Sequence, residues 1–146
     1  MTMTQQLLLP STKEVFNKSE KSKESFFVKM PADIMHYVHV PNYKPEYNYL
    51  YAIIVDYYNV DYGYAYPTEW QISRRYGKGI QTVRTHLRAL ESFGLIKISK
   101  PKGNKIYVPY KPLSKRELFE KCPEAQKKFT DNKQAEDAER RRGGRI

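Results

Sequence analysis

The sequence contains a single cysteine, Cys122, among its 146 residues. One thiol can neither form a disulfide within the chain nor supply the ligands of a structural zinc site, so neither feature holds the fold together. No run of about 18 apolar residues is present to span a membrane. The first ten residues have no basic segment and only three consecutive leucines, too few for a secretory signal. These absences predict a cytoplasmic protein.

Motifs of common catalytic sites are also missing. The sequence has no glycine-rich phosphate-binding loop and no nucleophile-elbow motif, and residue spacing supports no Ser/His/Asp group. His36 and His39 are three residues apart, but only Asp33 lies near enough in sequence to add a third ligand. Structural histidines are therefore the better interpretation. We expect a protein that is not an enzyme and that needs no metal and no cofactor.

The stretch from Pro67 to Pro109 carries the strongest local signals. Thr68 precedes Gln71 by three residues, the spacing of a capping box at the start of a helix, and Gly77 is placed to end that helix. Beyond a short turn, four apolar residues recur at helical spacing: Ile80, Val83, Leu87 and Leu90. Gly94 fits the end of this second helix. The pattern predicts two helices joined by a tight turn.

Two short strands are expected after the second helix. Residues Leu95–Ser99 and Ile106–Val108 are rich in β-branched and aromatic side chains, and the basic loop 100–105 between them contains Pro101 and Gly103. A β-hairpin therefore follows the helix pair. Together these elements predict an α+β fold.

This order of residues resembles the winged helix-turn-helix family, and within it the small domains of phage and plasmid replication initiators and regulators. The matching positions are Ile72-Ser73, Gly77, Thr82-Val83, Leu87 and the run Leu90–Ile96. Ser73 stands where alanine is more usual, and Gly79 stands where a serine N-cap is more usual, although glycine is an acceptable cap. The resemblance covers Pro67 to Pro109 and implies a winged helix-turn-helix fold with the hairpin as its wing.

Positive charge is concentrated on the same motif. The net charge is +10, and residues 74–105 hold nine basic residues against one acidic residue, Glu91. Residues 1–73 hold six basic and eight acidic residues. A basic surface that is merely solvated would be scattered along the chain, whereas this distribution is typical of a polyanion-binding protein. We therefore expect double-stranded DNA as the partner.

If the second helix enters the major groove of DNA, its outward polar residues reach base edges. The candidates for base reading are Gln81, Thr82, Arg84, Thr85 and Arg88. Arginine can pair with guanine, and glutamine with adenine, through two hydrogen bonds each. The candidates for contact with the DNA backbone are Arg74, Arg75, Lys78, Lys100, Lys102, Asn104 and Lys105. His86 is expected to pack or to touch a phosphate.

Ten of the 13 tyrosines lie between Tyr37 and Tyr66. Apolar and aromatic residues recur at helical spacing from Glu46 to Asn59, which predicts an N-terminal aromatic helix that is apolar on most sides. Such a helix belongs in a core or at a dimer interface, and the alternative is that its tyrosines stack on single-stranded bases. Because one domain of this size reads few base pairs, we expect a homodimer or cooperative assembly on repeated sites. The aromatic helix is the candidate interface.

The domain is expected to span residues 26–122. Residues 1–25 are polar and of mixed charge, which predicts a flexible arm. Residues 26–30 are a strand candidate that either pairs with the wing or leads into a helix near Ala32–Tyr37.

The chain beyond the wing is expected to form one short helix and a tail. Residues Ser114–Cys122 predict a helix that docks through Leu118 and Phe119. Residues 123–146 are highly charged and predict a disordered tail. The arginines of this tail either add phosphate contacts or remain solvated.

Three functional hypotheses remain open. The first is a sequence-specific duplex-DNA-binding protein of a phage, plasmid or other mobile element, acting in transcription regulation or replication initiation. The second is a non-specific or single-stranded nucleic-acid binder that uses the tyrosines. The third is a winged-helix module that docks on a host protein. A steep salt dependence of binding would separate the nucleic-acid hypotheses from the third.

Overall fold

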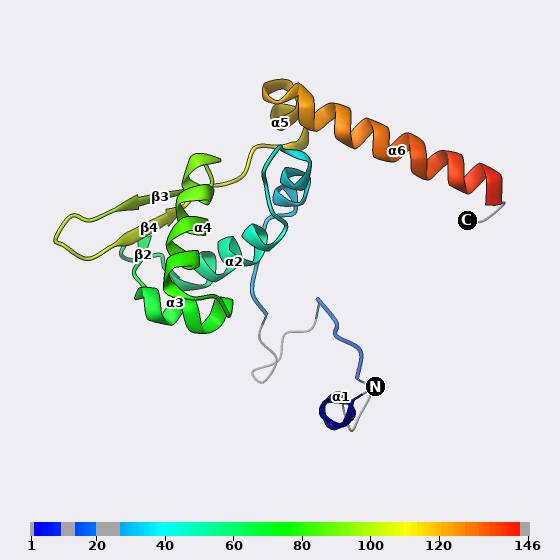
Figure 1. Cartoon of the computed structure of the whole chain (residues 1–146). Coiled ribbons are helices and arrows are strands. Elements are labelled where there is room, and N and C mark those ends of the chain that lie inside the picture. The colour runs from blue at the N-terminus through cyan, green and yellow to red at the C-terminus, as the bar shows by residue number, and fades with distance from the viewer. Residues whose placement is uncertain (1, 10–13, 20–26, 144–146) are drawn as a thin grey trace.

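The structure is a computed structural model that describes residues 2–9, 14–19 and 27–143 (Figure 1). Its elements in chain order are α1 (Met3–Leu7), the 3-10 helix η1 (Ala32–His39), α2 (Glu46–Tyr57), β1 (Tyr58–Asn59), β2 (Tyr64–Ala65), α3 (Glu69–Tyr76), α4 (Ile80–Ser92), β3 (Ile96–Ser99), β4 (Ile106–Pro109), α5 (Lys115–Lys121) and α6 (Pro123–Gly143). Within these residues, four short strands form one antiparallel sheet in the order β1-β2-β4-β3. The predicted α+β fold class is confirmed.

The helix-turn-helix forms through the predicted local signals. The Thr68 hydroxyl accepts the Gln71 N–H at 3.0 Å, and the Gln71 side chain accepts the Thr68 N–H at 2.8 Å, which completes the capping box. Gly77 ends α3 at φ 73°, a left-handed conformation that glycine adopts without a steric clash. Its N–H donates to the Ser73 carbonyl at 2.8 Å. The chain thus reverses tightly and starts α4 at Ile80.

The wing is the hairpin of β3 and β4 with its loop 100–105. Ile98 pairs with Tyr107 across it, and Tyr107 pairs on its other side with Ala65 of β2. The third strand is therefore β2. Residues 27–30 are not a strand, and residue 26 lies outside the described residues, so the predicted pairing of residues 26–30 with the wing is wrong. The alternative prediction, that this segment leads into a helix, is confirmed, because η1 begins at Ala32.

Helix α2 lies at the centre of the core. Its apolar and aromatic residues are buried within a single chain: Tyr47, Leu50, Tyr51, Ala52, Ile53 and Ile54. It contacts α3, α4 and β4, and the Tyr51 hydroxyl donates to the Tyr110 carbonyl at 2.6 Å. The core interpretation is confirmed. A dimer interface or a base-stacking surface on these residues is wrong, because the same chain already covers them.

The end of α2 also differs from the prediction. The helix stops at Tyr57 rather than Asn59, because Tyr58 is extended and begins β1. Residues 60–63 form a turn, and β1 and β2 form a small hairpin around it in which Asn59 pairs with Tyr64. The segment between α2 and α3 is thus part of the sheet.

Helix α5 forms as predicted, with Leu118 and Phe119 buried.

Helix α6 occupies most of the segment predicted to be a disordered tail, and Figure 1 shows it extending away from the wing end of the domain. Opposite charges four residues apart favour a helix, and this spacing recurs along α6 in the pairs Lys127–Asp131, Lys133–Asp137 and Glu136–Arg140. Ala125 and Phe129 pack its first turns against the core. No helix within residues 2–9, 14–19 and 27–143 is both long enough and apolar enough to cross a membrane.

Candidate nucleic-acid interface

Helix α4 presents one polar face beside the wing because its opposite face is fixed in the core. Val83, Leu87 and Leu90 are buried at helical spacing. Three of the predicted base-reading residues are exposed on the other side, namely Gln81, Thr85 and Arg88, while Thr82 and Arg84 are half-buried. The structure therefore places all five on one helix and leaves three of them open to a ligand.

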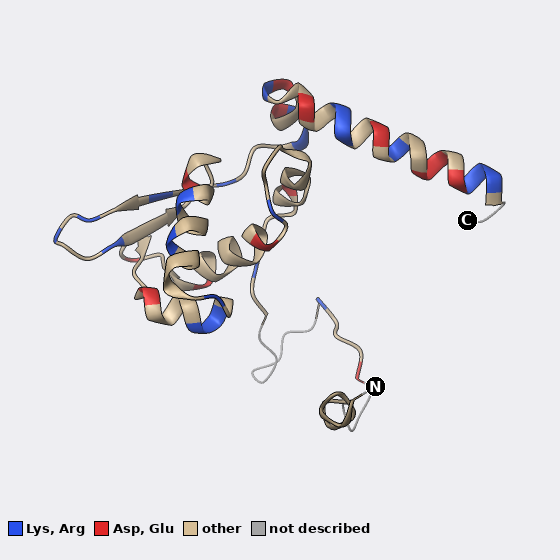
Figure 2. Cartoon of the chain, in the orientation of Figure 1, with Lys and Arg blue, Asp and Glu red and all other residues tan. Residues whose placement is uncertain are grey.

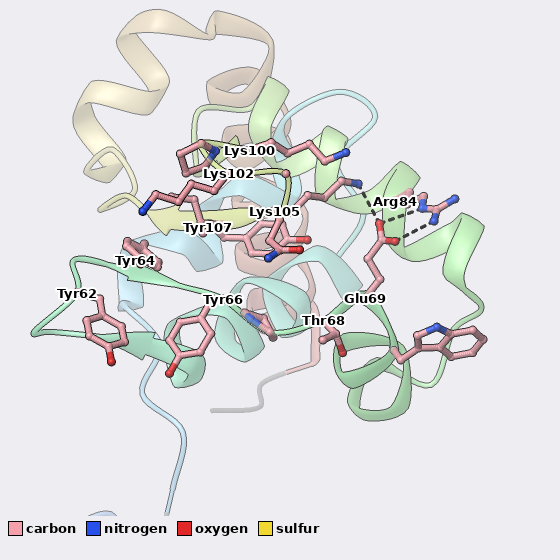
Figure 3. Close-up of a pocket in the computed structure, with 16 residues that line it drawn as sticks. Tyr62, Tyr64, Tyr66, Thr68, Glu69, Arg84, Lys100, Lys102, Lys105 and Tyr107 are labelled. Atoms are coloured by element: carbon pink, nitrogen blue, oxygen red, sulfur yellow. Dashed lines mark hydrogen bonds and ion pairs between the residues drawn. The ribbon is translucent and has the colours of Figure 1, made fainter.

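Arg84 is held by an acidic residue of the preceding helix. Its Nε donates to one carboxylate oxygen of Glu69 at 2.9 Å, and its Nη2 donates to the other at 2.8 Å. Lys105 of the wing donates to the same carboxylate at 2.9 Å, as Figure 3 shows. These three residues form an ion-pair triad that joins α3, α4 and the wing.

The triad sets the charge state of Glu69. The hydrogen bond from Arg84, aided by Lys105, lowers the pKa of the Glu69 carboxyl to about 2, so the group stays ionised at neutral pH. Sequence reasoning missed this contact. Glu69 lies on a different helix, 15 residues before Arg84, and no periodicity along α4 indicates it.

The predicted backbone-contact residues separate into exposed and engaged groups. Exposed residues are found in the wing loop, on α3 and in the turn: Lys100, Lys102, Asn104, Arg74 and Lys78, the last 3.6 Å from Glu46. Figure 2 shows basic residues along the wing loop, on α4 and at the end of α3.

The other two predicted backbone-contact residues form ion pairs within the protein. Lys105 is paired with Glu69, as described above. Arg75 is engaged with α2: it lies 2.8 Å from Asp56 and over the ring of Tyr57. The hydrogen bond to Asp56 also raises the Arg75 pKa.

The histidines contribute to packing. His86 is buried, with Nδ1 2.8 Å from the Tyr76 hydroxyl, and burial lowers the pKa of its imidazole. His36 and His39 contact the rings of Phe119 and Phe129 edge to face. All three histidines thus pack against aromatic rings, and for His86 this is the first of its two predicted alternatives. Among the described residues, no three His, Cys, Asp or Glu side chains gather as a group that could bind a metal ion.

An open groove of about 1090 Å³ lies between the wing, the start of α3 and the β1–β2 hairpin (Figure 3). We call it the aromatic groove, because Tyr62, Tyr64, Tyr66 and Trp70 line it together with Lys100, Lys102 and the triad. Sequence reasoning did not single out this cluster. The signal was present, since Tyr62, Tyr64 and Tyr66 alternate and would share one face of an extended segment.

A smaller hollow of about 400 Å³ lies on the α4 side of the wing. Arg88 and Ile98 line it, and Arg84, Lys100 and Lys105 border both hollows. The triad thus stands between the exposed face of α4 and the aromatic groove.

The arrangement of α3, turn, α4 and hairpin is consistent with a winged helix-like fold. No protein-family model and no curated protein matches the sequence. Among solved structures, one described as the N-terminal domain of a DNA binding protein is similar, with a TM-score of 0.52, 17% identity, and coverage of 75% of this chain and 92% of that chain. A Rep–DNA complex is similar with a TM-score of 0.52, 18% identity, and coverage of 73% and 92%. These similarities establish a shared fold.

Proposed function

We propose that this protein binds double-stranded DNA sequence-specifically, as a protein of a phage, plasmid or other mobile element that acts in replication initiation or transcription regulation. One observation carries the proposal: Gln81, Thr85 and Arg88 are exposed on α4 next to the basic wing. The solved structures that share this fold are described as a DNA binding protein and a Rep–DNA complex, which supports the same role. The role is one of binding without catalysis, in the cytoplasm.

In this role α4 lies in the major groove with its exposed face against the bases. Arg88 matches the O6/N7 edge of guanine, and Gln81 matches the N6/N7 edge of adenine. The wing lysines Lys100 and Lys102 contact the neighbouring phosphates and set the position of the domain on the duplex.

Arg84 joins the reading set through its remaining donors. Glu69 takes the Nε and one Nη2 hydrogen, which leaves Nη1 and the second Nη2 hydrogen at the tip of the guanidinium. The Arg84 side chain is 39% exposed and borders both hollows, which leaves it open to a ligand. A guanidinium held by a carboxylate loses less rotamer entropy when it bonds guanine, which favours the specific site.

A single α4 reads few base pairs, so useful specificity calls for a homodimer or for cooperative binding to repeated sites. The contact between copies would have to use a surface other than the buried residues of α2. Repeated half-sites in the bound DNA would mirror such an assembly.

Two measurements test the proposal. Affinity for duplex DNA should fall steeply with salt, by about 0.9 in log K per log salt unit for each phosphate contacted. A flat dependence would favour a module that docks on a host protein instead. Capture of genomic fragments followed by sequencing should then enrich few sites: an origin-like repeat array indicates replication, and promoter sites indicate regulation. Binding without enrichment of any sequence would overturn the specific role.

A further inference from the structure

The aromatic groove exposes an unusual amount of ring surface. Tyr62 and Tyr66 are 58% and 54% exposed, and Trp70 on the first turn of α3 is 75% exposed. The ring centroids of Tyr62, Tyr64 and Tyr66 lie 5.6–6.1 Å apart, so the three rings form one continuous surface. Single exposed aromatic residues are ordinary, whereas a cluster that lines a hollow marks a binding surface.

The opposite wall of the groove is basic. Lys100 and Lys102 line it from the wing, and Arg84 and Lys105 line it beside α3. The acidic residue in the lining is Glu69, whose charge is already balanced by Arg84 and Lys105. A ligand in the groove therefore meets aromatic rings on one side and uncompensated positive charge on the other.

The floor of the groove holds an unsatisfied polar group. Tyr107 of β4 lines the groove and is completely buried, and within the described part of the chain its hydroxyl has no hydrogen-bond partner. Buried hydroxyl groups are normally hydrogen-bonded, so this one is an unusual feature of the groove lining. Burial raises the pKa of Tyr107 to about 12, and the group therefore remains a hydrogen-bond donor at neutral pH.

We propose that the aromatic groove is a second nucleic-acid site that binds an unpaired polynucleotide strand. Bases stack on Tyr62, Tyr66 and Trp70, while phosphates lie along Lys100 and Lys102. The site shares Lys100 and Lys102 with the proposed duplex interface and goes beyond it through Tyr62, Tyr66 and Trp70, whereas Gln81, Thr85 and Arg88 do not line the groove. DNA and RNA strands share the chemistry that this site recognises.

An unpaired strand fits the groove better than a duplex or a small ligand. The flat faces of bases are covered by their neighbours in a duplex, and they become available to aromatic side chains when the strand is single. The groove has a volume of about 1090 Å³, at the upper end of the range of about 300–1,000 Å³ common for small-molecule pockets, and it is open to solvent. A segment of a longer chain can therefore lie in it.

Trp70 gives a direct readout, because it is the only tryptophan in the sequence and lines the groove. Short oligothymidylate and short oligouridylate, which form no duplex, are titrated separately into the intact protein. We expect Trp70 fluorescence to be quenched to saturation by the strand that binds, and comparison of the two titrations distinguishes DNA from RNA. Unchanged fluorescence with both oligonucleotides would overturn the proposal.

Substitutions keep Trp70 as the reporter and test the stacking itself. Tyr62→Ala and Tyr66→Ala should each weaken oligonucleotide binding about 5- to 150-fold, the loss typical of one stacked base. Tyr66→Phe should stay close to wild type, because the ring remains. Tyr110→Ala removes an exposed tyrosine outside the groove and serves as the matched control. Circular dichroism melting checks that each variant folds.

Two further outcomes would contradict a site for a stacked single strand. If Tyr66→Phe loses as much affinity as Tyr66→Ala, the hydroxyl and not the ring makes the contact. If Tyr62→Ala and Tyr66→Ala weaken duplex and single strand by the same factor, the groove holds a duplex backbone. Arg88→Ala should leave the Trp70 titration unchanged, so failure of duplex binding and failure of strand binding remain separate results.

Discussion

The guanidinium of Arg84 on α4 makes two hydrogen bonds, of 2.9 and 2.8 Å, to the carboxylate of Glu69 on α3. This pair fixes a predicted base-reading residue from outside its own helix. Because Lys105 shares the carboxylate, the pair also connects α4 to the wing. The position of Arg84 thus depends on three elements that are separate in the sequence.

Glu69→Gln should weaken binding to the specific DNA site while leaving binding to random duplex unchanged or slightly stronger. The substitution frees Arg84 from its fixed orientation, and it also removes a negative charge near the DNA. We expect a specific-site loss of about 1–3 kcal/mol, the range for one well-oriented base contact. Competition between the specific site and scrambled duplex measures both affinities. Glu120→Gln, an exposed acid on α5, is the matched control, and equal losses on the two DNAs would contradict a positioning role.

The stability of the folded protein should decrease at acidic pH through protonation of Glu69. Its folded-state pKa of about 2 lies below the ordinary value of 4.5, so its contribution to stability is complete above about pH 4.5 and is lost as pH falls toward 2. Glu69→Gln has no such group to titrate. The difference in melting temperature between wild type and Glu69→Gln should therefore shrink across this window. A difference that stays constant from pH 7 to about 2 would show that the pair does not stabilise the fold.

Local cues were sufficient to predict the helix-turn-helix and the wing. The capping box at Thr68, the left-handed Gly77 and the spacing of Val83, Leu87 and Leu90 each act within a few residues, and each appears in the structure. Contacts between distant segments were not predictable in this way. The pairing of β2 with β4 and the hydrogen bonds from Arg84 to Glu69 depend on how helices and strands pack against one another once they have formed. Helix α6 was missed because high charge indicated disorder, although the spacing of its charges favours a helix.

The position of α2 in the core predicts large losses on truncation. Ile54→Ala should lower the free energy of unfolding by about 2–5 kcal/mol, because Ile54 is fully buried and its removal leaves a cavity. Tyr51→Phe should cost about 1 kcal/mol through loss of the hydrogen bond to the Tyr110 carbonyl. Val60→Ala, at an exposed position, is the control. Chemical denaturation measures all three, and a near-neutral Ile54→Ala would contradict a central role for α2.

The last prediction separates residues that read bases from residues that hold the backbone. Arg88 is exposed on α4 and makes no contribution to the core, so Arg88→Ala should fold normally. On the specific site it should cost about 1–3 kcal/mol and relax the preference at one base pair, with little change on random duplex. Gln81→Ala should behave in the same way at a different position.

Lys102 in the wing loop should behave differently, because a phosphate contact carries no sequence information. Lys102→Ala should weaken specific and random duplex alike and should make the salt slope shallower by about one unit. Competition binding at several salt concentrations measures both effects in one series, and Lys121→Ala, an exposed lysine on α5, controls for net charge. If Arg88→Ala, Gln81→Ala and Lys102→Ala all weaken both DNAs equally, α4 does not read sequence. The protein would then be a non-specific duplex binder in which α4 and the wing recognise only the shape and charge of the backbone.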